Sequence, residues 1–282
     1  MAVFLRFSFA FLPLALLSCT PDQGRGSFAD ATDHYTVSEI GRIAARAKES
    51  SGLENATPEG DLWTHADGGN TARLYRITRQ GDLLQALDLD PIQNIDWEDL
   101  TQDEEHRLYI GDFGNNQNKR RNLRIYRLSG PELQHVDTIL FKYPDQHAFP
   151  PRKPRRNFDC EAFYYYQDSL YLFTKNRGTG GMVKQYVLPA APGRYTARLA
   201  DSLQLPTWVT AADISPDGRR VALLGTARVY LFERLPGRRL FDGLKTTLTL
   251  SKSGQAEALV FINKQDFIIS NEKGKLFQAH RK

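Results

Sequence analysis

An acidic residue recurs five times along this chain, each time beside a strand-like run of apolar residues. The five acids are Glu54, Glu98, Glu161, Asp213 and Glu257, which lie 44, 63, 52 and 44 residues apart. If each acid opens the innermost strand of a repeated unit, all five carboxylates converge on one central channel. Carboxylates held that close raise one another's pKa values unless a cation or hydrogen bonds offset their charge.

Two of the copies carry a second acid and an amide. The stretches Asn94–Glu98 and Asn157–Glu161 both read Asn-x-Asp-x-Glu. Because alternate side chains of a strand share a face, Asp96 and Asp159 are predicted to lie beside the glutamate of their own copy. Carboxylate and amide oxygens without a His or Cys set favour calcium over zinc or copper. The predicted calcium ligands are Glu54, Asp96, Glu98, Asp159, Glu161, Asp213 and Glu257.

Two other arrangements would neutralise the same acids. Lys175, which follows the second strand of the third repeat, could supply an internal cation. Alternatively, backbone amides of neighbouring strands could bind the carboxylates, which would then only hold the ring together. The sequence leaves both arrangements open beside calcium.

Polar residues follow the second strand of several repeats, where they are predicted to line one rim of the channel. The predicted ligand-binding residues are Asp67, Asp112, Asn115, Lys175 and Glu272, with Arg156 from a basic loop. His65 is predicted to act as a general base if the protein is a hydrolase, with Glu98 as a second catalytic residue. The alternative for His65 is a structural hydrogen bond.

The segments around the five acids predict an all-β fold. A second strand follows each acid, as at Leu62–His65, and a third strand carries an aromatic residue, as at Leu74–Ile77. Short strands repeated every 40–50 residues or so are typical of a β-propeller. A fourth strand is visible in four repeats, and Tyr35–Ile40 is predicted to complete the fifth. This pairing of the two chain ends would close the ring and remove exposed strand edges.

The prediction is therefore a β-propeller of five four-stranded blades. The longest interval between acids is explained by a loop around Gln146–Arg156, and a sixth blade is the alternative explanation. A two-sheet sandwich is the competing fold.

The N-terminus is predicted to be a targeting segment. Arg6 precedes an apolar run too short to span a membrane, and Leu16–Cys19 then resembles the lipobox of bacterial lipoproteins. The resemblance implies lipidation of Cys19 and a place in the bacterial cell envelope, and Thr20 favours the outer membrane. An ordinary secretory signal is the alternative. The predicted divisions are a signal peptide at 1–18, a flexible tether at 19–34 and one propeller domain at 35–282.

The composition limits the partners. The net charge is +4 and no nucleic-acid-binding motif is present, so nucleic acid is not an expected partner. The basic clusters Lys119–Arg121 and Arg152–Arg156 indicate either an anionic ligand or solvated loops. Without Cys19 only Cys160 remains, so no internal disulfide can form.

Three stretches, Asn94–Leu100, Tyr109–Asn116 and Trp63–Gly69, resemble a group of secreted bacterial propellers. The chain is more distantly similar to the SdiA-regulated propellers and to the esterase-like-activity-of-phytase domain. In those relatives the acidic strand starts face the channel and are associated with calcium, and the resemblance implies that role for both Asp-x-Glu pairs. This chain departs by having five repeats and by lacking the first acid at Ala211 and Gln255, which argues against a site for several calcium ions.

Three functions compete. The favoured one is a lipid-anchored binding module that holds calcium in the channel and presents the rim to a small polar or anionic ligand or to an envelope protein. The alternative is a calcium-dependent hydrolase of an ester, phosphoester or lactone. The third is a scaffold whose channel acids are purely structural. No Gly-x-Ser-x-Gly or His-Glu-x-x-His motif is present to indicate a particular hydrolase.

Overall fold

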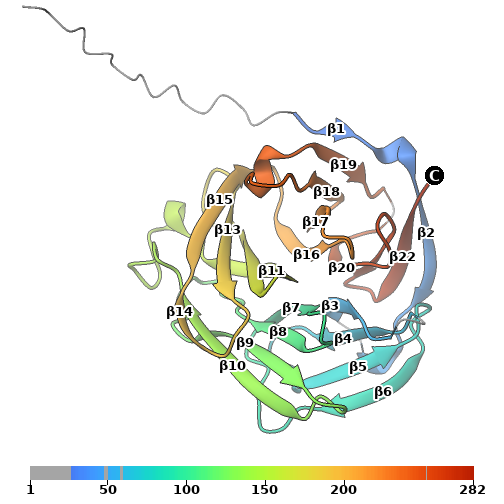
Figure 1. The fold of residues 1–282 in the computed structure, drawn as a ribbon, viewed down its shortest axis with the longest axis horizontal. Coiled ribbons are helices and arrows are strands. Elements are labelled where there is room, and N and C mark those ends of the chain that lie inside the picture. Colours follow the sequence, from blue (N-terminus) through green and yellow to red (C-terminus); the bar gives the residue numbers. More distant parts are fainter. Residues whose placement is uncertain (1–26, 48–49, 58–59, 252) are drawn as a thin grey trace, which may run out of the picture.

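The computed structural model describes residues 27–282 apart from residues 48–49, 58–59 and 252. The predicted signal peptide and Cys19 lie outside the described residues. The described chain forms five antiparallel four-stranded blades around a central axis, so the predicted all-β, five-bladed propeller is confirmed (Figure 1). No sixth blade occurs in the described part of the chain, and the interval containing Gln146–Arg156 is a loop with one short 3-10 helix.

The strands of each blade run from the channel to the outer edge. Blade 1 contains β3 (Ser50–Asn55), β4 (Leu62–Ala66), β5 (Arg73–Ile77) and β6 (Leu83–Asp88). Blade 2 contains β7 (Trp97–Gln102), β8 (Leu108–Asp112), β9 (Leu123–Ser129) and β10 (His135–Lys142). Blade 3 contains β11 (Asp159–Tyr166), β12 (Ser169–Lys175), β13 (Met182–Pro189) and β15 (Arg198–Gln204). Blade 4 contains β16 (Val209–Ile214), β17 (Arg220–Gly225), β18 (Arg228–Glu233) and β19 (Lys245–Thr249). Four 3-10 helices are described: η1 (Thr32–His34), η2 (Ala45–Ala47), η3 (Lys153–Arg155) and η4 (Leu240–Asp242).

Blade 5 joins the two ends of the described chain. It contains β20 (Ala256–Phe261), β21 (Phe267–Asn271) and β22 (Lys275–Arg281), and β2 (Tyr35–Arg42) forms its outer edge. The antiparallel register runs from Tyr35 opposite Arg281 to Arg42 opposite Lys275. Figure 1 shows β2 running alongside β22. The predicted closure is therefore confirmed, and the ring has no free edge at the junction.

Two short strands extend the outer edges of the sheets of blades 2 and 4. β14 (Gly193–Thr196) pairs in parallel with β10, and β1 (Ala29–Asp30) pairs in parallel with β19. Phe28 packs edge-on against Tyr230 and Phe232 of blade 4. Residues 28–34, which the sequence assigned to the flexible tether, therefore belong to the folded domain, because their apolar side chains have a blade to pack against.

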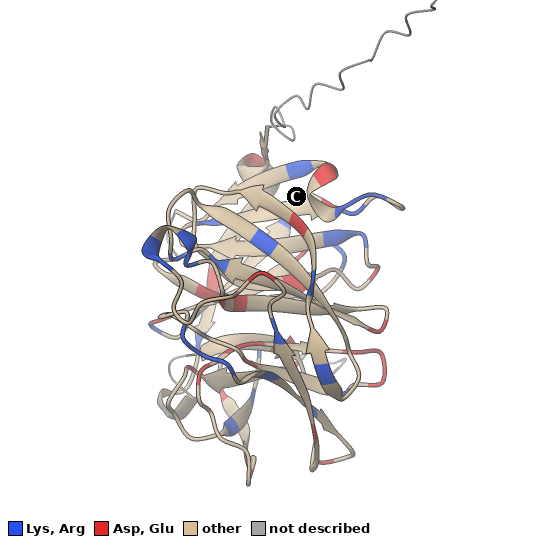
Figure 2. Ribbon diagram, turned by 90° about the vertical axis from the view of Figure 1, so that its left-hand side faces the viewer, with Lys and Arg blue, Asp and Glu red and all other residues tan. Residues whose placement is uncertain are grey.

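The hydrophobic core lies between adjacent blades. Between blades 2 and 3, for example, Tyr109 and Ile125 pack in one cluster with Phe163 and Leu172, all with almost no exposed surface. Each such side chain contributes about 1.5–3 kcal/mol by its burial. Charged residues are found in the turns at both ends of the blades, as the edge-on view in Figure 2 shows.

Every inner strand carries a β-bulge near its first residue. The register shifts at Ser51 in β3, Glu98–Asp99 in β7, Glu161 in β11, Thr210 in β16 and Glu257 in β20. A bulge leaves a residue unpaired and re-aims its side chain. These five bulges therefore define one level of the channel, and they decide which side chains face it.

Candidate functional site

The pairing register places the five repeated acids at two depths. Glu98, Glu161 and Glu257 lie in the bulges of their strands. Glu54 and Asp213 lie three residues further along β3 and β16. The prediction of a single ring of five equivalent acids is therefore wrong. The residue of blade 1 that corresponds to Glu98 is Ser51, because the bulge, and not the nearest acid, sets the register.

The two deeper acids bind backbone amides of the neighbouring blade. Glu54 accepts a hydrogen bond at Oε2 from the N–H of Gln102, 3.1 Å away. Asp213 accepts one at Oδ2 from the N–H of Phe261, 2.7 Å away. Burial raises the pKa of Asp213 to about 7 and that of Glu54 well above its usual value. The sequence left three arrangements open for the acids: calcium, an internal cation and backbone amides. Hydrogen bonds from backbone amides are the arrangement found at these two carboxylates.

Another acid, which the sequence analysis missed, joins three inner strands. Asp99 on β7 has no exposed surface, and its Oδ2 accepts hydrogen bonds from the N–H groups of Phe163 and Ala212 at 3.1 and 3.3 Å. Those amides belong to β11 and β16, so the carboxylate reaches across the channel to a blade that is not its neighbour. Burial raises the pKa of Asp99 well above its usual range. This side chain therefore links the inner strands of blades 2, 3 and 4.

A pocket of about 640 Å³ opens at one end of the channel, and we call it the acidic pocket. Six carboxylates and two cationic side chains line it. The full lining is Ser50, Ser51, Asp67, Gly68, Asp96, Glu98, Asn116, Glu161, Lys175, Arg177, Gln255, Glu257 and Glu272. The lining therefore carries a surplus of acidic groups, which would attract cations.

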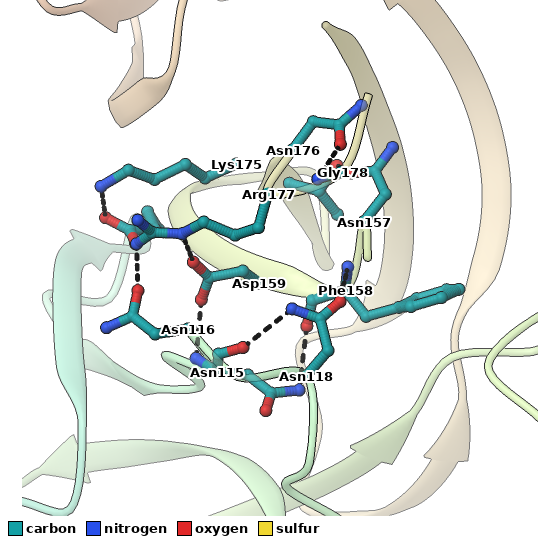
Figure 3. Close-up of polar contacts among 12 residues, drawn as sticks. Asn115, Asn116, Asn118, Asn157, Phe158, Asp159, Lys175, Asn176, Arg177 and Gly178 are labelled. Atoms are coloured by element: carbon teal, nitrogen blue, oxygen red, sulfur yellow. Dashed lines mark hydrogen bonds and ion pairs between the residues drawn. The ribbon is translucent and has the colours of Figure 1, made fainter. Parts of the chain in front are cut away.

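The blade 3 side of the pocket is neutralised by internal cations. Lys175 Nζ lies 2.7 Å from Glu161 Oε2, and Arg177 lies 2.7 Å from Glu161 Oε1. Arg177 Nε also lies 2.6 Å from Asp159 Oδ2, and its guanidinium donates to Asn116 (Figure 3). The sequence predicted Lys175 as a possible internal cation but missed Arg177. Arg177 follows the strand by two residues, where the chain geometry is not predictable from alternation.

The blade 1 and 2 side is not neutralised in this way. Asp67, Asp96 and Glu98 each place one oxygen so that all three lie within 4.8 Å of one another. No hydrogen bond to the carboxylate of Asp96 or Glu98 is found among the described residues. Burial raises the pKa of Asp96 to about 6, and burial and the neighbouring Glu161 raise that of Glu98 well above its usual range.

Two glycines make this close approach possible. A Cβ added at Gly114 would collide with the carboxylates of both Glu98 and Asp96, and one added at Gly68 would collide with Asp96. The backbone at these glycines therefore lies close around carboxylate oxygens, and the cluster has no nitrogen or sulfur ligand among its three residues. An all-oxygen site of irregular geometry suits calcium.

Glu257 lies in the acidic pocket on blade 5. Burial raises its pKa to about 7, although Gln255 donates a hydrogen bond to its Oε1 at 2.8 Å. Glu272 lines the same side. A carboxyl group with a pKa near neutrality can exchange a proton with a bound molecule at physiological pH.

The structure brings some of the predicted rim residues to this pocket. Asp67, Lys175 and Glu272 line it. Asp112 does not, because it is fully buried and paired with Arg120 at 2.8 Å. Asn115 is also buried, and its N–H donates to Asp159 Oδ1 at 2.7 Å.

Arg156 and His65 also lie elsewhere. Arg156 donates to the carbonyl of Pro151 and lines no part of the acidic pocket. His65 is only 1% exposed, and its Nδ1 donates to the Ala66 carbonyl at 2.9 Å. Burial lowers its pKa to about 4, so the imidazole is neutral. The prediction that His65 is a rim base is therefore wrong. The strand alternation turned this residue towards Trp97, against whose ring it packs edge-on.

An exposed aromatic residue beside the two cationic side chains of the pocket was also missed. Trp208 is 52% exposed, and its ring lies 5.7 Å from Lys175 Nζ and 5.3 Å from the guanidinium carbon of Arg177. The ring offers a flat apolar face beside two cations, which is an arrangement suited to holding a small ligand.

The raised carboxyl pKa values predict how stability depends on pH. In the presence of a chelator, we expect the free energy of unfolding to fall as the pH rises from about 4 to about 7, because the folded pKa values of Asp213 and Glu257 are both about 7, above their ordinary values of 3.8 and 4.5. The folded protein then holds protons that the unfolded chain has released. Urea unfolding at several pH values measures this. Glu257→Gln should flatten the dependence, and a stability that rises over this range would contradict it.

Comparison with known proteins supports the fold and goes no further. No protein-family model matches the chain, and no curated protein matches it. Similar solved structures include the PQQ-bound aldose sugar dehydrogenase from Streptomyces coelicolor (11% identity, TM-score 0.53, covering 88% of this chain and 98% of the other). A gluconolactonase from Xanthomonas campestris is similar at 12% identity and a TM-score of 0.52, covering 88% of this chain and 90% of the other. A protein described as a putative gluconolactonase is similar at 12% identity and a TM-score of 0.52, covering 84% of this chain and 76% of the other.

The fold and the site together define a β-propeller with an acidic pocket at one end of its channel. At such low identity the similar structures show the fold alone. In the described part of the chain, no helix is long and apolar enough to cross a membrane.

Proposed function

We propose that this propeller binds one calcium ion through Asp67, Asp96 and Glu98 and uses the acidic pocket to hold a small polar ligand. One observation carries the proposal: Glu98 is 6% exposed, faces the pocket and receives no hydrogen bond among the described residues. A buried carboxylate without a partner is costly, and a bound cation would remove that cost.

The position of the ion follows from the internal cations. Glu98, Asp159 and Glu161 also form a close cluster, but Asp159 and Glu161 are already paired with Arg177 and Lys175. A calcium ion there would have to displace two cations. The cluster of Asp67, Asp96 and Glu98 has no such competitor among the described residues, so it is the better site.

The remaining surface of the pocket suits the ligand. A volume of about 640 Å³ accommodates a small molecule. Lys175 and Arg177 would attract oxygen atoms of the ligand, while Trp208 would cover one of its faces. A ligand rich in hydroxyl or carboxylate oxygens could contact the calcium ion and these cations at once.

A second candidate function is calcium-dependent hydrolysis of an ester, phosphoester or lactone. The specific observation in its favour is Glu257, a carboxyl group in the same pocket with a pKa of about 7, which is suited to a general base. The gluconolactonase fold likeness is consistent with this candidate but does not carry it. A screen of such substrates with and without Glu257→Gln tests it: turnover that the variant loses would support hydrolysis.

The lipid anchor at Cys19 and a place in the bacterial cell envelope, at the outer membrane, complete the proposal. They rest on the sequence Leu16–Cys19 and on Thr20, which lie outside the described residues. Labelling of the expressed protein with a radioactive fatty acid tests them. The label should be lost in Cys19→Ser.

Calcium binding has a direct measurement. We expect about one equivalent of calcium in the protein by elemental analysis, and a melting temperature that falls after chelation and returns with added calcium. Magnesium should restore less, because it demands a stricter octahedral geometry. If the protein contains no metal and chelation leaves its melting temperature unchanged, both calcium-dependent functions are contradicted. The scaffold function would then be the one that remains.

A further inference from the structure

A second pocket of about 640 Å³ lies at the opposite end of blades 3 and 4, and we call it the basic groove. The direction of β11 shows that the ends differ: Glu161 near its start lines the acidic pocket, whereas Tyr164 and Tyr166 near its end line the basic groove. The proposed function does not use this groove.

Five arginines line the basic groove: Arg198, Arg219, Arg234, Arg238 and Arg239. The acid in the lining is Asp217, whose Oδ1 already accepts hydrogen bonds from the Ser215 hydroxyl and the Arg219 N–H. The groove therefore carries a clear surplus of positive charge, although the whole chain has a net charge of only +4.

Two of these arginines are fixed in place by contacts. Arg234 donates to the Gly218 carbonyl at 2.7 Å and lies 3.9 Å above the ring of Tyr166. Arg239 pairs with Asp242 at 3.0 Å. For Arg198, Arg219 and Arg238, no ion pair is found in the described ranges, and all three residues are exposed. A guanidinium group of this kind can bind two oxygens of one phosphate through two parallel hydrogen bonds.

Exposed leucines lie among the same segments. Leu235 lines the groove and is 42% exposed, and Leu244, whose carbonyl accepts the Glu233 N–H beside Arg234, is 68% exposed. Arginines beside exposed apolar side chains are typical of surfaces that rest in the headgroup region of a bilayer.

The N-terminal chain enters the domain at this end. β1 runs parallel to β19, with Ala29 opposite Thr246. Extending that register by two residues places Ser27 level with Leu244, beside the loop that carries Arg238. The described chain therefore begins, at Ser27, at the end of the propeller that carries the basic groove.

We propose that the basic groove and its leucines dock on the phosphate headgroups of an anionic lipid bilayer. The arginines bind the phosphates, the leucines enter the interface, and the acidic pocket at the other end faces the aqueous phase. This surface holds the domain in one orientation and acts independently of calcium in the acidic pocket.

Vesicle co-sedimentation at low salt tests the proposal. The full chain carrying Cys19→Ser, which removes the thiol that lipidation would use, is mixed with phosphatidylcholine vesicles with or without phosphatidylglycerol. We expect binding to the anionic vesicles, and at least about tenfold weaker binding for Arg198→Glu/Arg219→Glu/Arg238→Glu. The matched control is Arg152→Glu/Lys153→Glu/Arg155→Glu, which changes the net charge equally at the other end and should bind like the parent protein.

A neutral variant and a soluble probe complete the test. Leu244→Ser leaves the charge unchanged and should weaken vesicle binding several-fold. All variants should keep the parent melting temperature, because the changed side chains are exposed. Equal vesicle binding by the parent and the groove variant would overturn the proposal. So would a groove variant that loses only its affinity for inorganic phosphate in solution, because the groove would then serve a soluble ligand.

Discussion

Glu98→Gln is expected to abolish the response of this protein to calcium. The substitution keeps the shape of the side chain but removes the charge of the most buried of the three proposed ligands. We expect calcium affinity to fall by about 100-fold or more, since the charge of the ligands sets the affinity of such sites. Isothermal titration calorimetry measures the affinity, and melting with and without calcium measures the effect on stability.

The sign of the stability change without calcium makes this prediction specific. In the presence of a chelator, Glu98→Gln should be more stable than the parent at pH 8, because burial and the charges of Glu161, Asp159 and Asp96 disfavour an ionised Glu98. A site residue that merely supported the fold would lose stability under both conditions. Unchanged calcium affinity in Glu98→Gln would remove the proposed metal site.

Glu54→Gln is the matched control from the deeper level. It makes the same chemical change, but its carboxylate binds the N–H of Gln102 and does not line the acidic pocket. We expect its effect on stability at pH 8 to be the same with and without calcium, because Glu54 is not a proposed calcium ligand. Its calcium affinity should stay at the parent value.

The comparison of Glu54 with Glu98 also shows what the sequence could predict. The blade count, the strand order and closure by β2 were predictable, because they depend on periodic apolar runs and on a strand missing from the last repeat. The depth of each acid was not predictable, because one bulge shifts every later side chain of its strand. Aligning the repeats on their acids therefore placed Glu54 and Glu98 at the same level of the channel, although their surroundings differ.

The candidate site was predictable only in part for the same reason. Asp96, Glu98 and Asp67 were named from alternation and from turn residues, and they do come together. Arg177 and Trp208 lie in loops, where no period fixes the direction of a side chain. Asp99 was missed because strict alternation would turn it away from Glu98, whereas both lie in the bulge of β7.

Asp99→Ala is expected to be the most destabilising substitution in the channel. Its carboxylate accepts hydrogen bonds from the backbone N–H groups of Leu100, Phe163 and Ala212, at 2.9, 3.1 and 3.3 Å. Removal leaves these buried donors without that acceptor and opens a gap where three blades meet. We expect a loss of about 3–5 kcal/mol in the free energy of unfolding, measured with urea by tryptophan fluorescence.

Two variants separate the loss of acceptors from a general sensitivity of the inner strands. Thr101→Val removes one buried acceptor, the hydroxyl that receives the Tyr165 N–H at 3.0 Å, and should cost about 1 kcal/mol. Asp99→Asn keeps one acceptor oxygen and should lie between the two. If Asp99→Ala costs no more than Thr101→Val, then Asp99 does not join the blades as argued. Folded Asp99→Ala protein should still bind calcium, because its carboxylate lies outside the acidic pocket.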